Sequence, residues 1–140
     1  MQMLIVGIGA LGGTIAARAL RAGLPVRLAA RNTESAEVLR RSGLRVSGIG
    51  GEVEAGTIDV AALEDYGKGN QFDLILLATK AQHALEVAPQ VVGLLAPEGV
   101  ILPIQNGGVA RALADHPPCS RTWSAAVRLR STLSTAMWWR

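Results

Sequence analysis

Short, continuous apolar runs recur along this chain. Four of them predict buried strands: Met3–Val6, Val26–Ala30, Asp73–Ala78 and Val100–Ile104. Parallel strands that are covered on both faces show such continuous runs, whereas half-exposed strands alternate apolar and polar residues. The runs therefore predict the centre of a parallel sheet.

Most of the stretches between these runs contain apolar residues at helical spacing. Apolar residues recur three or four positions apart in two stretches: Leu11, Ile15, Ala16, Ala19 and Leu20 before Gly23, and Ala81, Leu85, Ala88, Val92 and Leu95. Further helices are predicted around Glu34–Ser42 and Gly107–Ala114. This alternation predicts an α/β fold with a mostly parallel sheet and helices on both faces.

The stretch between residues 44 and 58 has a different pattern. Leu44–Ser47 and Glu52–Ile58 predict two strands, and the glycine-rich link between them, Gly48-Ile49-Gly50-Gly51, predicts a β-hairpin. Further along, Pro97-Glu98-Gly99 predicts a turn after the last helical face.

The end of the chain differs in composition from the rest. Residues 1–110 carry nine basic and ten acidic residues, whereas from Arg111 onward five Arg accompany one acid, Asp115. The length of 140 residues suits one domain, so we place a folded domain at residues 1–115 and an atypical basic tail at residues 116–140. Because the positive charge gathers in the unpatterned tail, it argues against a nucleic-acid partner.

Several signals favour the cytoplasm. The single cysteine, Cys119, cannot form an internal disulfide, which fits a reducing compartment. The apolar N-terminus lacks a basic leader, so we expect no signal peptide. No charge-free run of about 20 apolar residues predicts a membrane span, so no membrane partner is expected. No metal site is predicted either.

A glycine motif follows the first predicted strand and opens a predicted helix. Gly7-Ile8-Gly9-Ala10-Leu11-Gly12 matches the GxGxxG pattern. In a Rossmann-type domain Gly7 allows a tight turn, Gly9 the close approach of a pyrophosphate, and Gly12 the packing of helix on strand. Free N–H groups at the helix N-terminus then bind the phosphates. A glycine-rich turn without a ligand is the alternative.

The end of the second strand indicates which dinucleotide is bound. NAD sites usually carry Asp or Glu there, about 20 residues after the glycines, to bind the ribose hydroxyls. This chain has Arg31 there, and its first acid is Glu34. Because a guanidinium can bind a 2′-phosphate, NADP(H) is favoured over NAD(H). A solvated surface Arg is the alternative.

Lys80 follows the predicted strand Asp73–Ala78, with Thr79 as the expected N-cap of the next helix. A cation in a first helical turn is unfavourable, which makes sense if an anion or a polar ligand lies there. An exposed Lys at a frayed helix end is the alternative. We expect His83, one turn on, to be a polar residue of the helix surface.

Asn106 follows the strand Val100–Ile104, although Asn-Gly also favours a plain turn. The carboxyl ends of parallel strands meet at one edge of a sheet, and ligands bind there. We therefore expect one crevice to hold four features that each follow a different strand: Gly9, Arg31, Lys80 and Asn106.

Together these residues resemble the N-terminal domain of the ketopantoate reductases (2-dehydropantoate 2-reductases). The matching segments are GIGALG at 7–12, Arg31, TKAQ at Thr79–Gln82 and QNG at 105–107, with a hairpin-like insertion near Gly48. The resemblance covers roughly residues 1–115, and the combination of the TKA and QNG runs is more specific than GxGxxG alone.

The resemblance implies NADPH-dependent reduction of 2-dehydropantoate to pantoate, a step toward pantothenate and coenzyme A. Gly7–Gly12 would hold the pyrophosphate and Arg31 the 2′-phosphate. Lys80 and Asn106 would contact the nicotinamide-side ribose, and Asn106 also the keto-acid substrate. The family's catalytic Lys and substrate-binding Glu lie in a helical C-terminal domain that is missing here, so we assign no catalytic residue and expect little activity from this chain alone.

The tail departs from the family pattern, since residues 117–140 are rich in Arg, Ser and Thr and have no clear period. Our hypothesis is a truncated or frame-shifted reductase, and a genuine basic extension is the alternative. Two other functions stay open: a stand-alone NADP-binding or regulatory module, and another NADP-dependent hydroxyacid or sugar dehydrogenase domain. A separate C-terminal chain and a homo-oligomer are both open as partners.

Overall fold

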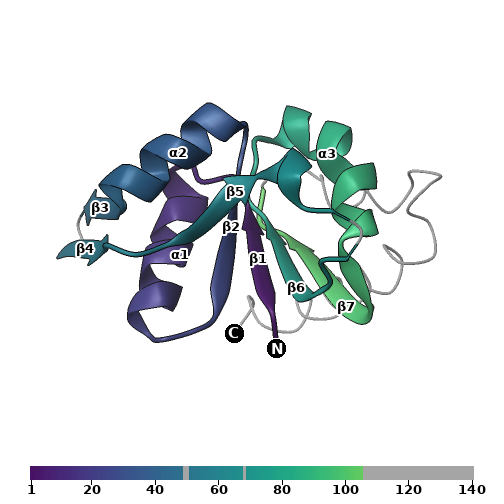
Figure 1. Cartoon of the computed structure of the whole chain (residues 1–140), viewed down its shortest axis with the longest axis horizontal. Coiled ribbons are helices and arrows are strands. Elements are labelled where there is room, and N and C mark those ends of the chain that lie inside the picture. The colour runs from purple at the N-terminus through teal and green to yellow at the C-terminus, as the bar shows by residue number, and fades with distance from the viewer. Residues whose placement is uncertain (49–50, 68, 106–140) are drawn as a thin grey trace, which may run out of the picture.

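Parallel strands form the centre of the molecule (Figure 1). The computed structural model describes residues 1–48, 51–67 and 69–105. The strands of its main sheet are β1 (Met3–Val6), β2 (Val26–Ala30), β5 (Asp59–Ala62), β6 (Phe72–Leu77) and β7 (Leu95–Pro103). They lie in the order β5-β2-β1-β6-β7, and each neighbouring pair is parallel. The predicted parallel sheet is thus confirmed.

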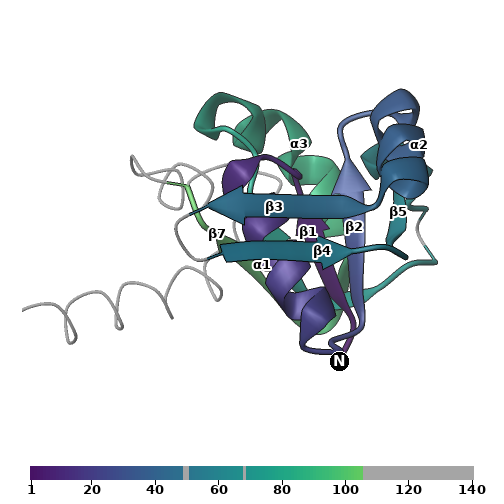
Figure 2. The same cartoon turned by 90° about the vertical axis from the view of Figure 1, so that its left-hand side faces the viewer.

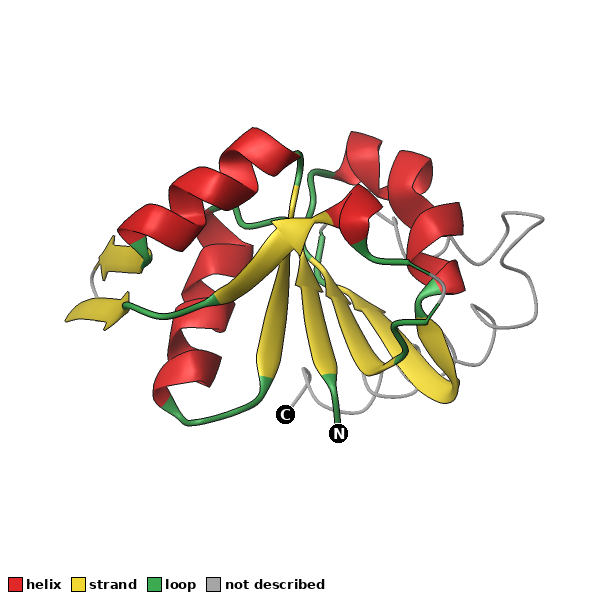
Figure 3. Ribbon diagram, in the orientation of Figure 1, coloured by secondary structure: helices red, strands yellow, loops and turns green. Residues whose placement is uncertain are grey.

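Helices cover both faces of this sheet (Figure 3). They are α1 (Ala10–Arg21), α2 (Thr33–Ser42) and α3 (Ala81–Gly93). Alternate residues of β1 point to opposite faces, as a strand requires. Leu4 and Val6 pack in one core cluster with α3, whereas Ile5 packs in a second cluster with α1 and with Ala36 of α2. The predicted α/β architecture with helices on both faces is therefore confirmed.

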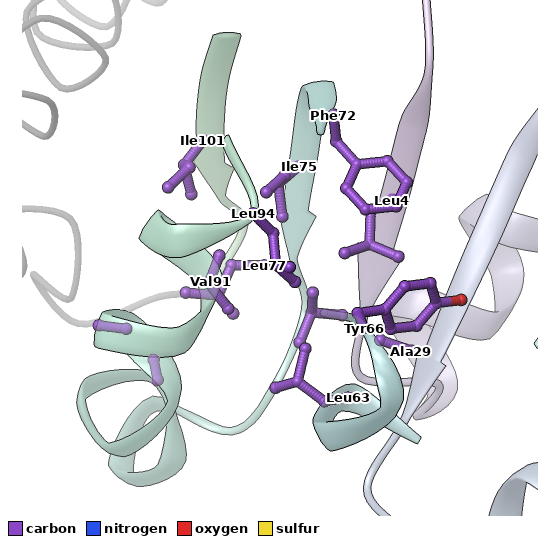
Figure 4. Packing of buried hydrophobic residues seen from close by; sticks show 13 residues of the cluster. Leu4, Ala29, Leu63, Tyr66, Phe72, Ile75, Leu77, Val91, Leu94 and Ile101 are labelled. Carbon is purple, nitrogen blue, oxygen red and sulfur yellow. The ribbon is translucent and has the colours of Figure 1, made fainter. Parts of the chain in front are cut away.

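The core on the α3 side holds two aromatic rings (Figure 4). Tyr66 and Phe72 meet edge to face, with ring centroids 5.8 Å apart. The Tyr66 hydroxyl donates a hydrogen bond of 3.1 Å to the carbonyl oxygen of Leu28 in β2. Burial, with a smaller contribution from the Asp59 carboxylate, raises the pKa of Tyr66 to about 12. The side chain of Tyr66 thus connects the segment before β6 to β2.

The predicted hairpin is confirmed, and it packs on α1 (Figure 2). Strands β3 (Leu44–Gly48) and β4 (Gly51–Ala55) pair antiparallel outside the main sheet. Leu44 and Val53 are buried in the cluster that contains α1. The hairpin therefore extends the core on that face.

The predicted strand Glu52–Ile58 is wrong as a single strand. The chain bends at Gly56 and Thr57, and β5 then begins at Asp59 and pairs with β2 at the edge of the main sheet. The apolar positions continue across the bend, because Ile58 and Val60 both enter the core. A pattern of apolar residues alone could not show that they belong to two different sheets.

The predicted turn at Pro97-Glu98-Gly99 is also wrong as a boundary. These residues lie inside β7, where the pairing with β6 shifts register between Phe72 and Leu74. Leu95, expected on the helix face, is the first residue of that strand. The predicted helix Gly107–Ala114 and the tail at residues 116–140 lie outside the described residues.

None of the helices that the structure describes is long and apolar enough to cross a membrane. Within the same residues, no group of His, Cys, Asp and Glu is arranged to hold a metal ion.

Candidate functional site

The three glycines of the GxGxxG motif, in the loop between β1 and α1 and at the start of α1, differ in their surroundings. Gly7 has a φ of +93°, and a Cβ there would lie 2.8 Å from the backbone nitrogen of Thr79. A Cβ on Gly12 would overlap the carbonyl oxygen of Gly7. In contrast, a Cβ on Gly9 would meet nothing within 4 Å. Gly7 and Gly12 therefore allow the turn and the packing, whereas Gly9 leaves open space above the loop.

Among the described residues, no side chain caps the N-terminus of α1. Gly9 is its N-cap, and its first turn has no acidic residue. The first N–H groups of a helix lack intrahelical acceptors and attract anions. This end of α1 can therefore bind a phosphate without displacing a side chain.

A cleft of about 520 Å³ opens at the carboxyl ends of β1, β2 and β6. This volume lies in the range typical of small-molecule sites. The cleft is lined by Val6, Gly7, Ile8, Gly9, Ala29, Ala30, Arg31, Ser35, Leu39, Leu63, Ala78, Thr79, Lys80, His83, Glu86 and Val87. A second hollow, between α1 and the hairpin, measures about 170 Å³ and is too small for a dinucleotide.

The cleft brings together five of the residues that the sequence indicates: Gly7, Ile8, Gly9, Arg31 and Lys80. Ala10 and Leu11 begin α1 and do not line it, and Gly12 lies buried against Gly7. Asn106 lies outside the described residues. The convergence of Gly9, Arg31 and Lys80 follows from the parallel strands that precede them.

Arg31 lies between β2 and α2 and is exposed. Within the described part of the chain its guanidinium makes no hydrogen bond and no ion pair. The next residue, Asn32, caps α2 by accepting a 2.9 Å hydrogen bond from the backbone N–H of Ser35. The cap fixes the start of α2 and leaves the guanidinium free beside the cleft.

Lys80, and not Thr79, is the N-cap of α3. Its carbonyl oxygen accepts hydrogen bonds from the backbone N–H groups of His83 and Ala84, while its side chain makes no capping bond. Thr79 instead accepts a 3.4 Å hydrogen bond from Nε2 of Gln105, which draws its side chain toward the end of β7. A residue with a poor capping side chain thus occupies the cap position beside the cleft.

The same Gln105 amide carries an unsatisfied oxygen. Its Oε1 is buried and has no hydrogen-bond partner among the described residues. A buried acceptor without a partner is unfavourable by about 1–3 kcal/mol, which makes it a candidate for contact with a further polar group. Gln105 lies two residues after the end of β7 and is the first residue of the QNG run at 105–107.

Sequence reasoning missed the contribution of α3 beyond Lys80. His83 lies on the surface of α3, as predicted, with 42% of its side chain exposed, and it also lines the cleft together with Glu86 and Val87. The spacing of these residues could have indicated that they line the cleft. Residues three or four apart lie on the same face of a helix, and Lys80 was already a candidate site residue.

These features fit a dinucleotide. The open space at Gly9, the uncapped helix end, and Arg31 and Lys80, which have no partners within the described ranges, suit a phosphate-rich ligand. The apolar floor, with Leu39, Leu63 and Val87, suits a flat base.

Known proteins share the sequence pattern and the fold of this chain. The family model for ketopantoate reductase PanE/ApbA matches residues 3–138. This chain belongs to the ketopantoate reductase family. The match extends beyond residue 115, where the resemblance read from individual motifs stops.

Relatives of the ketopantoate reductase family share the fold. The uncharacterized oxidoreductase YkpB of Bacillus subtilis (strain 168) is 33% identical over 107 residues, which cover 76% of this chain and 34% of that protein. The crystal structure of 2-dehydropantoate 2-reductase from Geobacter metallireducens GS-15 is 28% identical, with a TM-score of 0.69, over 81% of this chain and 37% of that one. A D-mandelate dehydrogenase solved with NADH and anilino(oxo)acetate is 26% identical, with a TM-score of 0.72, over 82% of this chain and 36% of that one.

The ketopantoate reductase relatives are much longer than the matching region. This chain spans only 34–37% of the length of these three proteins. The similarity therefore concerns the part of these proteins that matches this chain, about a third of their length.

Proposed function

We propose that this chain provides the NADP(H)-binding half of a reductase that converts 2-dehydropantoate to pantoate in the cytoplasm. The observation that carries the proposal is the presence of Arg31 and Lys80, both without partners among the described residues, on the same cleft as the open face of Gly9. Family membership supports the reaction class, because the matching family is that of the ketopantoate reductases.

In this proposal the residues that the sequence indicates contact different parts of the cofactor. The loop Gly7–Gly12 and the start of α1 bind the pyrophosphate through backbone N–H groups. Arg31 binds the 2′-phosphate, since its guanidinium presents donors only and is always charged. Lys80 and Asn106 contact the nicotinamide-side ribose, and Asn106 also the keto acid. When bound, the cofactor supplies the hydride, and the protein supplies position and electrostatics.

The choice of NADP(H) over NAD(H) rests on charge at the end of β2. Among the residues that line the cleft from β2 and α2, Arg31 is the charged one, and Glu34 does not line it. A ribose hydroxyl would need an acceptor at this position, whereas a 2′-phosphate needs a donor. The D-mandelate dehydrogenase relative was solved with NADH, and NADH is therefore the competing cofactor in the binding experiment.

A binding experiment tests the cofactor assignment. NADPH and NADH are titrated into the wild-type chain, into Arg31→Asp and into Arg21→Asp, a matched control at the far end of α1. We expect wild type to prefer NADPH and Arg31→Asp to lose about 10- to 100-fold in NADPH affinity, because a charge-assisted contact is replaced by repulsion. Arg21→Asp should leave both affinities unchanged. Failure of wild type to bind either cofactor, or an unchanged ratio in Arg31→Asp, would overturn the proposal.

A turnover experiment tests whether this chain binds the cofactor without supplying the catalytic acid. The cleft contributes cofactor contacts and no assigned acid for the keto oxygen, so we expect the purified chain to oxidise NADPH with 2-dehydropantoate at a negligible rate. A positioned general acid typically contributes about 10²–10⁴-fold. A rate normal for an enzyme would contradict this assignment.

A further inference from the structure

Glu86 is the single carboxylate among the described residues that line the cleft. It projects from α3, on the same side of the helix as His83 and Lys80. Its Oε2 lies 3.1 Å from Nδ1 of His83. The sequence and the proposed function assign no role to either residue.

The position of the cleft between α2 and α3 indicates which end of a dinucleotide Glu86 would meet. In Rossmann-type folds the residue after the second strand faces the adenosine ribose, and here that residue is Arg31. Leu39 of α2 and Val87 of α3 line the same cleft, and Figure 1 shows the two helices above the ends of the central strands. Glu86 and Val87 lie nearly two helical turns beyond Lys80 and share the cleft with Arg31 and Leu39. We therefore assign this part of α3 to the adenosine end, and Lys80 at its start to the other ribose.

Arg31 and Glu86 have opposite hydrogen-bonding chemistry. A guanidinium only donates, and an ionised carboxylate only accepts. A 2′-phosphate offers acceptors and negative charge, so it is attracted by Arg31 and repelled by Glu86. Free ribose hydroxyls and the adenine amine offer donors, which a carboxylate can bind.

We propose that Glu86, held by His83, limits the preference of this cleft for a 2′-phosphorylated adenosine and so determines nucleotide selectivity together with Arg31. The inference rests on the proposed function, because it assumes that the cleft binds a dinucleotide. His83 acts as a positioning residue: a proton on Nδ1 would be donated to Glu86 and would keep its carboxylate beside the cleft.

The test uses adenosine fragments, which report on this end of the cleft alone. Dissociation constants for adenosine 2′,5′-bisphosphate and for 5′-AMP are measured by NMR titration with the full chain. The variants are Glu86→Gln and a matched control, Glu98→Gln, an exposed carboxylate of β7 that does not line the cleft. We expect Glu86→Gln to raise the affinity ratio of bisphosphate to 5′-AMP by about three- to tenfold, since one partly screened repulsion is removed. Glu98→Gln should leave the ratio unchanged although it removes the same charge.

A double-mutant cycle tests the role of His83. His83→Ala should shift the ratio in the same direction as Glu86→Gln, and it should add nothing in the Glu86→Gln background. His83→Gln should retain the wild-type ratio, because its amide can still donate to Glu86. A purely structural role of His83 would change both affinities together and leave the ratio unaltered.

The possible outcomes distinguish a failure of the proposed function from a failure of the inference about Glu86. If wild type binds neither fragment, the proposed function fails and this inference fails with it. If wild type binds both fragments but Glu86→Gln keeps the wild-type ratio, the inference is wrong while the proposed function stands.

Discussion

Gly12 faces the carbonyl oxygen of Gly7 so closely that no Cβ fits between them. A methyl group on Gly12 would also come within 2.9 Å of the Cβ of Ala78 in the segment after β6. The contact joins the start of α1 to two strands of the sheet. It places the helix end over the strand ends, where the cleft opens.

Gly12→Ala should therefore destabilise the fold, by about 2–4 kcal/mol, because both neighbours are packed and one is backbone. The measurement is urea-induced unfolding. Gly13→Ala is the matched control, since a Cβ there would lie at an ordinary 3.8 Å from Leu44. The control should be neutral or stabilising by up to about 1 kcal/mol, as Ala is the better helix former. Equal losses in both variants would contradict the packing argument.

Gly9→Ala should separate binding from folding. The new methyl group would enter open space, so we expect the free energy of unfolding to change by less than about 0.5 kcal/mol. It would occupy the space that we assign to the pyrophosphate, and NADPH affinity should fall at least about tenfold. Calorimetric titration measures this loss. An unchanged affinity would place the phosphates elsewhere.

Lys80→Ser should stabilise the protein and weaken nucleotide binding. Serine can cap α3, whereas Lys80 makes no capping bond, so we expect a gain of about 1 kcal/mol. Removal of the ammonium should lower NADPH and NADH affinity together, by about fivefold, in contrast to the selective effect at Arg31. Asn32→Ala, which removes the existing cap of α2, provides the opposite stability control. A loss of stability in Lys80→Ser would show that the ammonium has a structural role.

Tyr66 should make stability fall in alkali. Its pKa is raised from 10.0 to about 12, mainly by burial, so the folded state holds the proton more tightly than the unfolded state. The stabilisation is complete below pH 10 and is lost as the pH rises to about 12. The loss should be on the order of 2 kcal/mol. Urea unfolding across this range, compared with Tyr66→Phe, measures it; the variant should lack this contribution, and an identical pH profile would rule it out.

Local patterns were sufficient for the central elements of this fold. Continuous apolar runs predicted β1, β2 and β6, and the hairpin followed from alternation around Gly48. They failed at β5, where apolar residues continue across a bend, and inside β7, where the turn-like residues Pro97-Glu98-Gly99 lie at a register shift. The boundaries of these strands depend on pairing with strands that are distant in the sequence, and this pairing cannot be predicted from a single stretch of residues.

The sequence by itself determined the glycine loop, the parallel order of strand and helix, and the placement of Arg31 and Lys80 at strand ends. These features follow from local steric rules and from the fact that parallel strands end at one edge. Only the tertiary structure showed that His83 and Glu86 face Arg31's cleft and that Lys80 is the cap of α3. The angle at which a helix packs on a sheet selects which of its side chains meet a ligand, and that angle is a property of the whole core.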